Sequence, residues 1–180
     1  MKNIFDNGFY DTKKLTKIGF KKIGKNVKIS KSCLIIGLKN ISLGNNIRID
    51  AFTSIIADKG YLNIKNNIHV GGHCHILSSG GVIIDDNCTL SQGVKIYSQT
   101  DDYSGKSPTG LFVKNKDQNY KKGKVKIGSF SIIGSGTVIL PKITIAKKCS
   151  IGALSLVNKN LSKSGVYAGI PCKRINYTRT

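Results

Sequence analysis

The stretch IGSFSIIGSGTVILPKITIAKKCSIGALSLV, residues 127–157, places an isoleucine or valine at every sixth position. The same six-residue period occurs earlier, in groups of three apolar residues: Ile23, Ile29, Ile35; Leu43, Ile49, Ile55; Ile64, Val70, Ile76; and Ile84, Leu90, Ile96. A period of six fits neither a helix of 3.6 residues per turn nor an alternating strand. It is typical of a solenoid in which each hexad forms one short strand and a turn. We therefore expect an all-β protein, a parallel β-helix.

Extra residues between hexads occur only after every third hexad, at the steps 35–43, 55–64, 76–84 and 96–127. If three hexads make one triangular coil, every insertion leaves from the same corner. Ile49 then stacks on Val70 and Leu90, and Ile55 stacks on Ile76 and Ile96.

This grouping predicts a short N-terminal cap over residues 1–22, in which 11–20 form one or two helical turns. A β-helix follows over 23–163, with an inserted loop at about 97–126, and then a C-terminal cap and tail over 164–180. A loop longer than about fifteen residues inside a compact domain is usually functional or disordered. The loop is therefore a candidate location for functional residues.

Composition narrows the possible partners. The formal net charge is +20, but the lysines lie mostly at outward repeat positions and no nucleic-acid motif accompanies them. We expect no nucleic-acid partner; the charge suits phosphorylated substrates and is compatible with peripheral association with an anionic membrane surface. Four of five cysteines fall on inward positions, which predicts buried, reduced thiols and a cytoplasmic protein (Cys33, Cys74, Cys88, Cys149). No apolar run is long enough to span a membrane.

Three motifs resemble the hexapeptide-repeat acyltransferases: Ile133-Gly-Ser-Gly-Thr137, Ile151-Gly-Ala153, and Ala168-Gly-Ile-Pro-Cys-Lys-Arg174. The resemblance covers about residues 20–176 and is to the galactoside and xenobiotic acetyltransferase branch. It is closer still to bacterial sugar acetyltransferases of surface-polysaccharide synthesis, through Ile68-His-Val-Gly-Gly-His-Cys74 and Asp101-Asp-Tyr-Ser-Gly105. It implies a left-handed β-helix, a homotrimer with active sites between subunits, and acetyl-CoA as cosubstrate.

The resemblance also implies a loop histidine as the catalytic base, and aligning the hexads puts Asp101 at that place. A carboxylate with an ordinary pKa of roughly 4 is a weak base for a sugar hydroxyl. It suffices more readily for an amino sugar, where only the ammonium is deprotonated. We expect Asp101 and His73 to be catalytic, since His73 falls where relatives carry an acceptor-binding asparagine. His69 and Asp102 are further candidates, although Asp102 also fits a turn that merely fixes the loop.

The three histidines, His69, His73 and His75, all lie within one coil. A zinc site like that of the β-helical carbonic anhydrases needs ligands converging from different coils or subunits. We therefore expect no metal. His69 and His75 occupy positions that should face outward.

For acetyl-CoA, the resemblance implies contacts with Ser135, Ala153, Lys159 and Lys173, and Arg174 is a further phosphate partner. The leading hypothesis is an acetyl-CoA-dependent acetyltransferase that acts on an amino group or hydroxyl of a nucleotide- or lipid-linked sugar in surface-polysaccharide synthesis. The alternatives are a xenobiotic or antibiotic O-acetyltransferase and a non-catalytic β-helical scaffold.

Overall fold

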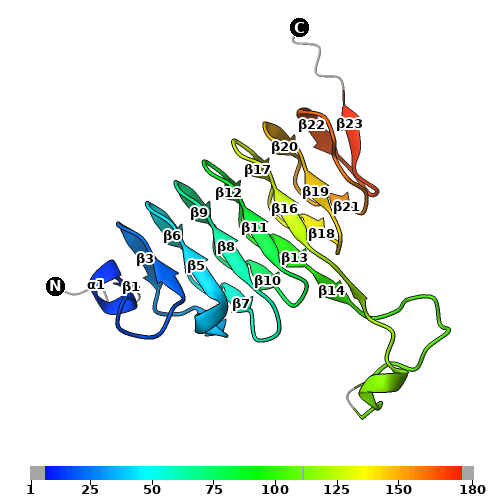
Figure 1. Ribbon diagram of the computed structural model, residues 1–180. Coiled ribbons are helices and arrows are strands. Elements are labelled where there is room, and N and C mark those ends of the chain that lie inside the picture. Colours follow the sequence, from blue (N-terminus) through cyan, green and yellow to red (C-terminus); the bar gives the residue numbers. More distant parts are fainter. Residues whose placement is uncertain (1–6, 111, 176–180) are drawn as a thin grey trace, which may run out of the picture.

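The computed structural model of the protein describes residues 7–110 and 112–175. In this part of the chain the backbone winds through about seven turns, and three sheets form the three faces of a prism (Figure 1). The first, here called the nine-stranded sheet, contains β1 (Phe9–Tyr10), β3 (Val27–Ser30), β6 (Ile47–Ile49), β9 (Ile68–Val70), β12 (Thr89–Leu90), β17 (Ile132–Ile133), β20 (Cys149–Ile151), β22 (Gly165–Ala168) and β23 (Lys173–Ile175). The β4–β21 sheet contains β4 (Leu34–Ile36), β7 (Ser54–Ile56), β10 (His75–Leu77), β13 (Lys95–Tyr97), β18 (Val138–Ile139) and β21 (Leu156–Val157). The β2–β19 sheet contains β2 (Lys22–Ile23), β5 (Ile41–Leu43), β8 (Leu62–Ile64), β11 (Val82–Ile84), β16 (Val125–Ile127) and β19 (Thr144–Ile145). The strands of these three sheets are parallel except for β1 and β23, which pair antiparallel at the two ends of the nine-stranded sheet.

The predicted stacking is confirmed. Val70 pairs with both Ile49 and Leu90 in the nine-stranded sheet, and Ile76 pairs with Ile55 and Ile96 in the β4–β21 sheet. All six side chains are buried in one continuous core. Side chains of a strand alternate between its two faces, so a six-residue period returns the same residue type to the same inward position in every coil.

Three corners join the sheets. The asparagine corner leads from the β2–β19 sheet into the nine-stranded sheet, and it holds Asn26, Asn46, Asn67 and Asn87, all with positive φ. Asparagine tolerates this left-handed conformation better than most residues. The side-chain Nδ2 groups of the first three donate to the side-chain Oδ1 of the asparagine in the next coil, at 3.0, 2.8 and 3.0 Å. This ladder fixes the register of the neighbouring strands.

The histidine corner leads from the nine-stranded sheet into the β4–β21 sheet and carries Phe52 and His73. The loop corner leads from the β4–β21 sheet to the β2–β19 sheet. All four insertions leave there, as predicted; the first holds the short helix η1 (Leu38–Asn40) and the last is the long loop. In Figure 1 this long loop extends away from the prism.

The N-terminal end of the prism is covered by the one-turn helix α1 (Thr12–Leu15). The Asp11 side chain caps it by accepting from the Lys14 N–H, and Leu15 is buried against the first coil. The strand β1, which was not anticipated from the sequence, pairs antiparallel with β3. The division into cap, helix and tail stays a prediction, and residues 1–6 and 176–180 at its ends lie outside the described residues.

The thiols of Cys74, Cys88 and Cys149 are buried, and Cys33 is partly buried. Burial raises the pKa of the Cys74 thiol to about 11, so it is an inert core group rather than a nucleophile. Across residues 7–110 and 112–175, no helix is long and apolar enough to cross a membrane.

Candidate active site

The long loop begins and ends as a two-stranded stalk. After β13 the chain forms β14 (Gln99–Thr100), which pairs antiparallel with β15 (Lys121–Lys122); the short helix η2 (Asn115–Asp117) lies between them. Beside the stalk is a cavity of about 500 Å³. It is lined by Leu77, Tyr97, Gln99, Thr100, Asp101, Tyr103, Tyr120, Val138 and Leu140. The cavity thus combines an apolar floor on the β4–β21 sheet with one exposed carboxylate, Asp101.

Asp102 has a different environment from its neighbour. It is buried, and its carboxylate accepts hydrogen bonds from the Ser104 N–H at 3.0 Å, the Ser104 hydroxyl at 2.8 Å and the Asn119 amide at 3.1 Å. These bonds, the backbone bond from Ser104 foremost, hold the pKa of the Asp102 carboxyl below its usual range, with a smaller contribution from Lys121. The arrangement favours a role in fixing the loop, the alternative weighed for this residue.

His73 projects from the histidine corner, where it has a positive φ of 59°. Its N–H donates to the Ala51 carbonyl in the preceding coil, and its ring stacks on Phe52 with centroids 5.0 Å apart. His73 and Asp101 lie at opposite ends of the strands of the β4–β21 sheet. The length of β13 separates the histidine corner from the loop. A single chain therefore does not bring these two candidates together.

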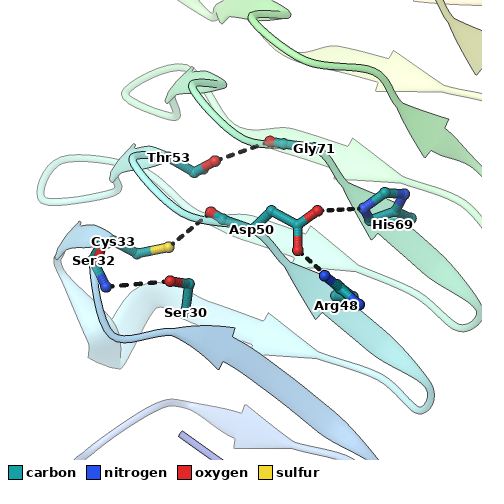
Figure 2. A network of polar contacts seen from close by, with 8 residues as sticks. All are labelled: Ser30, Ser32, Cys33, Arg48, Asp50, Thr53, His69 and Gly71. Atoms are coloured by element: carbon teal, nitrogen blue, oxygen red, sulfur yellow. Dashed lines mark hydrogen bonds and ion pairs between the residues drawn. The ribbon is translucent and has the colours of Figure 1, made fainter. Parts of the chain in front are cut away.

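His69 lies on the outer face of the nine-stranded sheet, as expected, and has a carboxylate partner. Its Nε2 lies 2.7 Å from Asp50 Oδ2, and the Nε of Arg48 lies 2.6 Å from the other oxygen, Oδ1 (Figure 2). Partial burial alone would raise the pKa of the Asp50 carboxyl, but the hydrogen bonds from His69 and Arg48 outweigh it and lower that pKa. Arg48 and Asp50 were not singled out from the sequence. The strand register could have indicated Arg48, because Arg48 occupies the same position as His69 one coil earlier.

His75 also faces outward and is half-buried on the β4–β21 sheet. Its Nδ1 lies 2.7 Å from the Ser54 hydroxyl, and its ring lies 5.4 Å from that of Tyr97, which lines the cavity. Burial, and then the charge of Lys95, lowers the pKa of His75. His75 is therefore a largely neutral ring at neutral pH beside the cavity.

The residues expected to bind acetyl-CoA lie in three places. Ser135 and Ala153 are exposed on the histidine corner in successive coils, where the Leu154 N–H donates to the Ser135 carbonyl. Lys159 follows β21, so it lies at the other end of the strands of the β4–β21 sheet, on the side of the loop corner. Lys173 and Arg174 are exposed on β23, and Arg174 donates to the Ser164 carbonyl at 3.2 Å. No cluster of three or more metal-ligating side chains is found in the part of the chain that the structure describes.

No protein-family model matches the chain. The dTDP-4-amino-4,6-dideoxy-D-glucose acyltransferase of Escherichia coli is 38% identical over 168 residues, which are 93% of this chain and 88% of that protein. A crystal structure of AntD, an N-acyltransferase from Bacillus cereus, in complex with dTDP and 3-hydroxybutyryl-CoA superposes with a TM-score of 0.90. It is 33% identical, and the match covers 96% of this chain and 91% of AntD. Galactoside O-acetyltransferase of Escherichia coli K12 is 29% identical over 115 residues, 64% of this chain and 56% of that protein.

The fold and these matches define an acyltransferase built on a left-handed parallel β-helix, which confirms the predicted fold class. The chain belongs to the hexapeptide-repeat acyltransferase family, as its motifs indicated.

Proposed function

We propose that the protein transfers an acetyl group from acetyl-CoA to the amino group of a dTDP-linked amino sugar, with dTDP-4-amino-4,6-dideoxyglucose as the first candidate. The match to the Escherichia coli enzyme named for this sugar, along almost the whole chain, carries the proposal. The site chemistry supports it: the one exposed carboxylate in the loop cavity is Asp101, and an amine acceptor makes the smaller demand on such a base.

In the proposed reaction, Asp101 accepts a proton from the sugar ammonium and frees the amine. The amine nitrogen attacks the thioester carbonyl carbon, and the C–N bond forms. The C–S bond then breaks, and the thiolate takes up the proton that the nitrogen loses. Asp101 then releases its proton to water, so the products are the amide, free CoA thiol and one proton, and atoms and charges balance without a metal or a redox partner.

We also propose a homotrimer in which each site combines two subunits. Asp101 and His73 lie at opposite ends of the strands of one subunit. A site that contains both therefore takes Asp101 from one subunit and His73 from its neighbour. The outer face of the β4–β21 sheet supports such packing because most of its side chains are apolar: Leu34 and Ile36 are 57% and 44% exposed, and Ile56, Leu77 and Leu140 are partly exposed beside them. A symmetric neighbour that covers this face would remove that surface from water.

The AntD structures include variants of one serine and of one aspartate, the aspartate ten positions further along that chain. Ser91 and Asp101 have the same separation in this chain. Ser91 lies on the histidine corner, where its carbonyl accepts the Cys74 thiol at 3.2 Å. We therefore add Ser91 to the proposed acceptor site, together with His73, and keep His69 and Asp102 as the weaker candidates.

For the cosubstrate, we propose that the CoA arm runs past the small side chains of Ser135 and Ala153. The CoA phosphates are then bound by cationic side chains of this subunit or its neighbour: Lys159, Lys173 and Arg174. We further propose a cytoplasmic setting within surface-polysaccharide synthesis, supported by the five free cysteines, with peripheral attraction to anionic membranes through the +20 charge.

The test is release of CoA thiol with acetyl-CoA and dTDP-4-amino-4,6-dideoxyglucose. A matched acceptor with a hydroxyl in place of the amine, a galactoside, and an antibiotic serve as comparison substrates. We expect saturable turnover with the amino sugar alone. Turnover with the hydroxyl analogue or the antibiotic instead, or acetyl-CoA binding without any acceptor-dependent thiol release, would overturn the proposal in favour of O-acetylation or a scaffold.

A further inference from the structure

We infer that Lys28, Arg48 and His69 form the subsite that binds the diphosphate of the nucleotide-linked acceptor. The inference rests on the proposed function, because it names the residues that would hold the acceptor's nucleotide part. It concerns a surface that is separate from the loop cavity with Asp101.

The three side chains occupy the same outward position in consecutive coils. Lys28 on β3 pairs with Arg48 on β6, and Arg48 pairs with His69 on β9. Neighbouring strands lie about 4.8 Å apart, so the row spans roughly 10 Å, about the reach of a diphosphate with its flanking oxygens. A row of this length can bind both phosphates of a diphosphate at the same time.

A hollow of about 380 Å³ lies along this row. Seven of its nine lining residues are polar or cationic, and the other two are Ile47 and Ile68: Asn26, Lys28, Asn46, Ile47, Arg48, Asn67, Ile68, His69 and Thr89. The cations supply charge-assisted hydrogen bonds to phosphate oxygens, and the asparagine and threonine side chains supply neutral donors. The hollow is thus chemically unlike the half-apolar loop cavity.

Asp50 positions two members of the row, Arg48 and His69, as Figure 2 shows. Its two carboxylate oxygens bind one partner each, Arg48 Nε and His69 Nε2, so its own charge is compensated. The bond to Asp50 uses only Nε, which leaves the two terminal guanidinium nitrogens for a phosphate. The Phe9 ring, 4.9 Å from Arg48 Cζ, supports the guanidinium from β1. Lys28 has no ion pair within the described ranges.

The row also lies on the strands that lead into the histidine corner, which is part of the proposed acceptor site. Asp50 is followed directly by Ala51, whose carbonyl accepts the His73 N–H at 3.0 Å. The row is therefore on the strands that lead into the corner with His73. A sugar bound there would carry its diphosphate back along the outer face of the nine-stranded sheet.

The experiment measures binding of dTDP and of thymidine to the full chain by calorimetry, without turnover. Arg48→Gln and Lys28→Gln remove the two permanent charges, and Lys39→Gln removes an exposed lysine of η1 as the matched control. We expect the affinity for dTDP to fall about tenfold in each row variant, as the loss of a charge-assisted bond implies. Thymidine and acetyl-CoA binding should stay unchanged, as should all binding to the control.

Wild-type affinity for dTDP in both Arg48→Gln and Lys28→Gln overturns the inference, even if the enzyme acylates dTDP-linked amino sugars. An equal loss of thymidine and dTDP binding also overturns it, because that pattern indicates a disturbed fold. Conversely, selective loss of dTDP binding in a protein that acylates no amino sugar supports the subsite and refutes the proposed function. Melting temperature and size-exclusion profile establish that each variant is folded and assembled.

Discussion

The body of the β-helix and the loop at 97–126 hold their polar groups in different ways. In the body a contact is repeated from coil to coil, as in the asparagine ladder of Asn26, Asn46 and Asn67. The loop has no coil above or below it to repeat a contact, and one buried carboxylate, Asp102, gathers several donors instead. Repetition gives the body tolerance to single changes in polar contacts, whereas the loop depends on single residues. The position of the adjacent, exposed Asp101 consequently depends on the contacts of Asp102, which no other coil repeats.

The largest effect should come from Asp101→Asn in the loop. If Asp101 is the base, kcat with the amino sugar falls roughly 10²–10⁴-fold, while the melting temperature stays near that of the wild type. Asp117→Asn, an exposed aspartate in the same loop, is the control and should keep full activity. Steady-state kinetics with purified protein decide the matter; unchanged kcat in Asp101→Asn removes this residue from the mechanism.

If the protein is the proposed homotrimer, mixed trimers sharpen the comparison by asking whether the loop of one subunit works on the body of another. Suppose that Asp101→Asn and His73→Ala are each inactive. Random reassembly of equal amounts then gives mixed trimers with one intact site in three, or about a quarter of wild-type activity. The two variants are mixed after mild denaturation, and separately reassembled variants are the controls. No recovery in trimers shown to be mixed would mean that both residues act within one subunit.

In the body, the core should respond strongly to truncation. Ile76 is fully buried between Ile55 and Ile96, and Ile76→Ala removes methyl groups from contacts on both sides. The expected loss in the free energy of unfolding is about 2–5 kcal/mol. Ile132→Ala, at an outward position 47% exposed, should cost less than about 1 kcal/mol. Denaturant titrations at one protein concentration measure both, and equal losses would contradict the assigned inward register.

The sequence predicted the body far better than the loop, for a physical reason. Inward positions recur every six residues and the extra residues follow every third hexad, so the pairing of Ile49 with Val70 follows from this grouping. The pairing of β14 with β15 depends on two segments with no repeat. The Arg48–Asp50–His69 contacts depend on side-chain orientation across coils, which the period does not encode. Likewise, the adjacent aspartates of the DDYSG turn gave no sign of which one is buried.

The smallest effect concerns that buried aspartate and its pH dependence. Because the folded pKa of Asp102 is depressed, its stabilisation of the loop is present above the ordinary carboxyl pKa of roughly 4. It is lost as the pH falls through the depressed folded value. Hydrogen exchange of residues 97–126, corrected for the intrinsic rate, should therefore quicken on acidification while the core strands stay protected. Asp102→Asn should quicken it severalfold at neutral pH and abolish the acid dependence. A loop equally protected in Asp102→Asn and wild type would show that other contacts support Asp101.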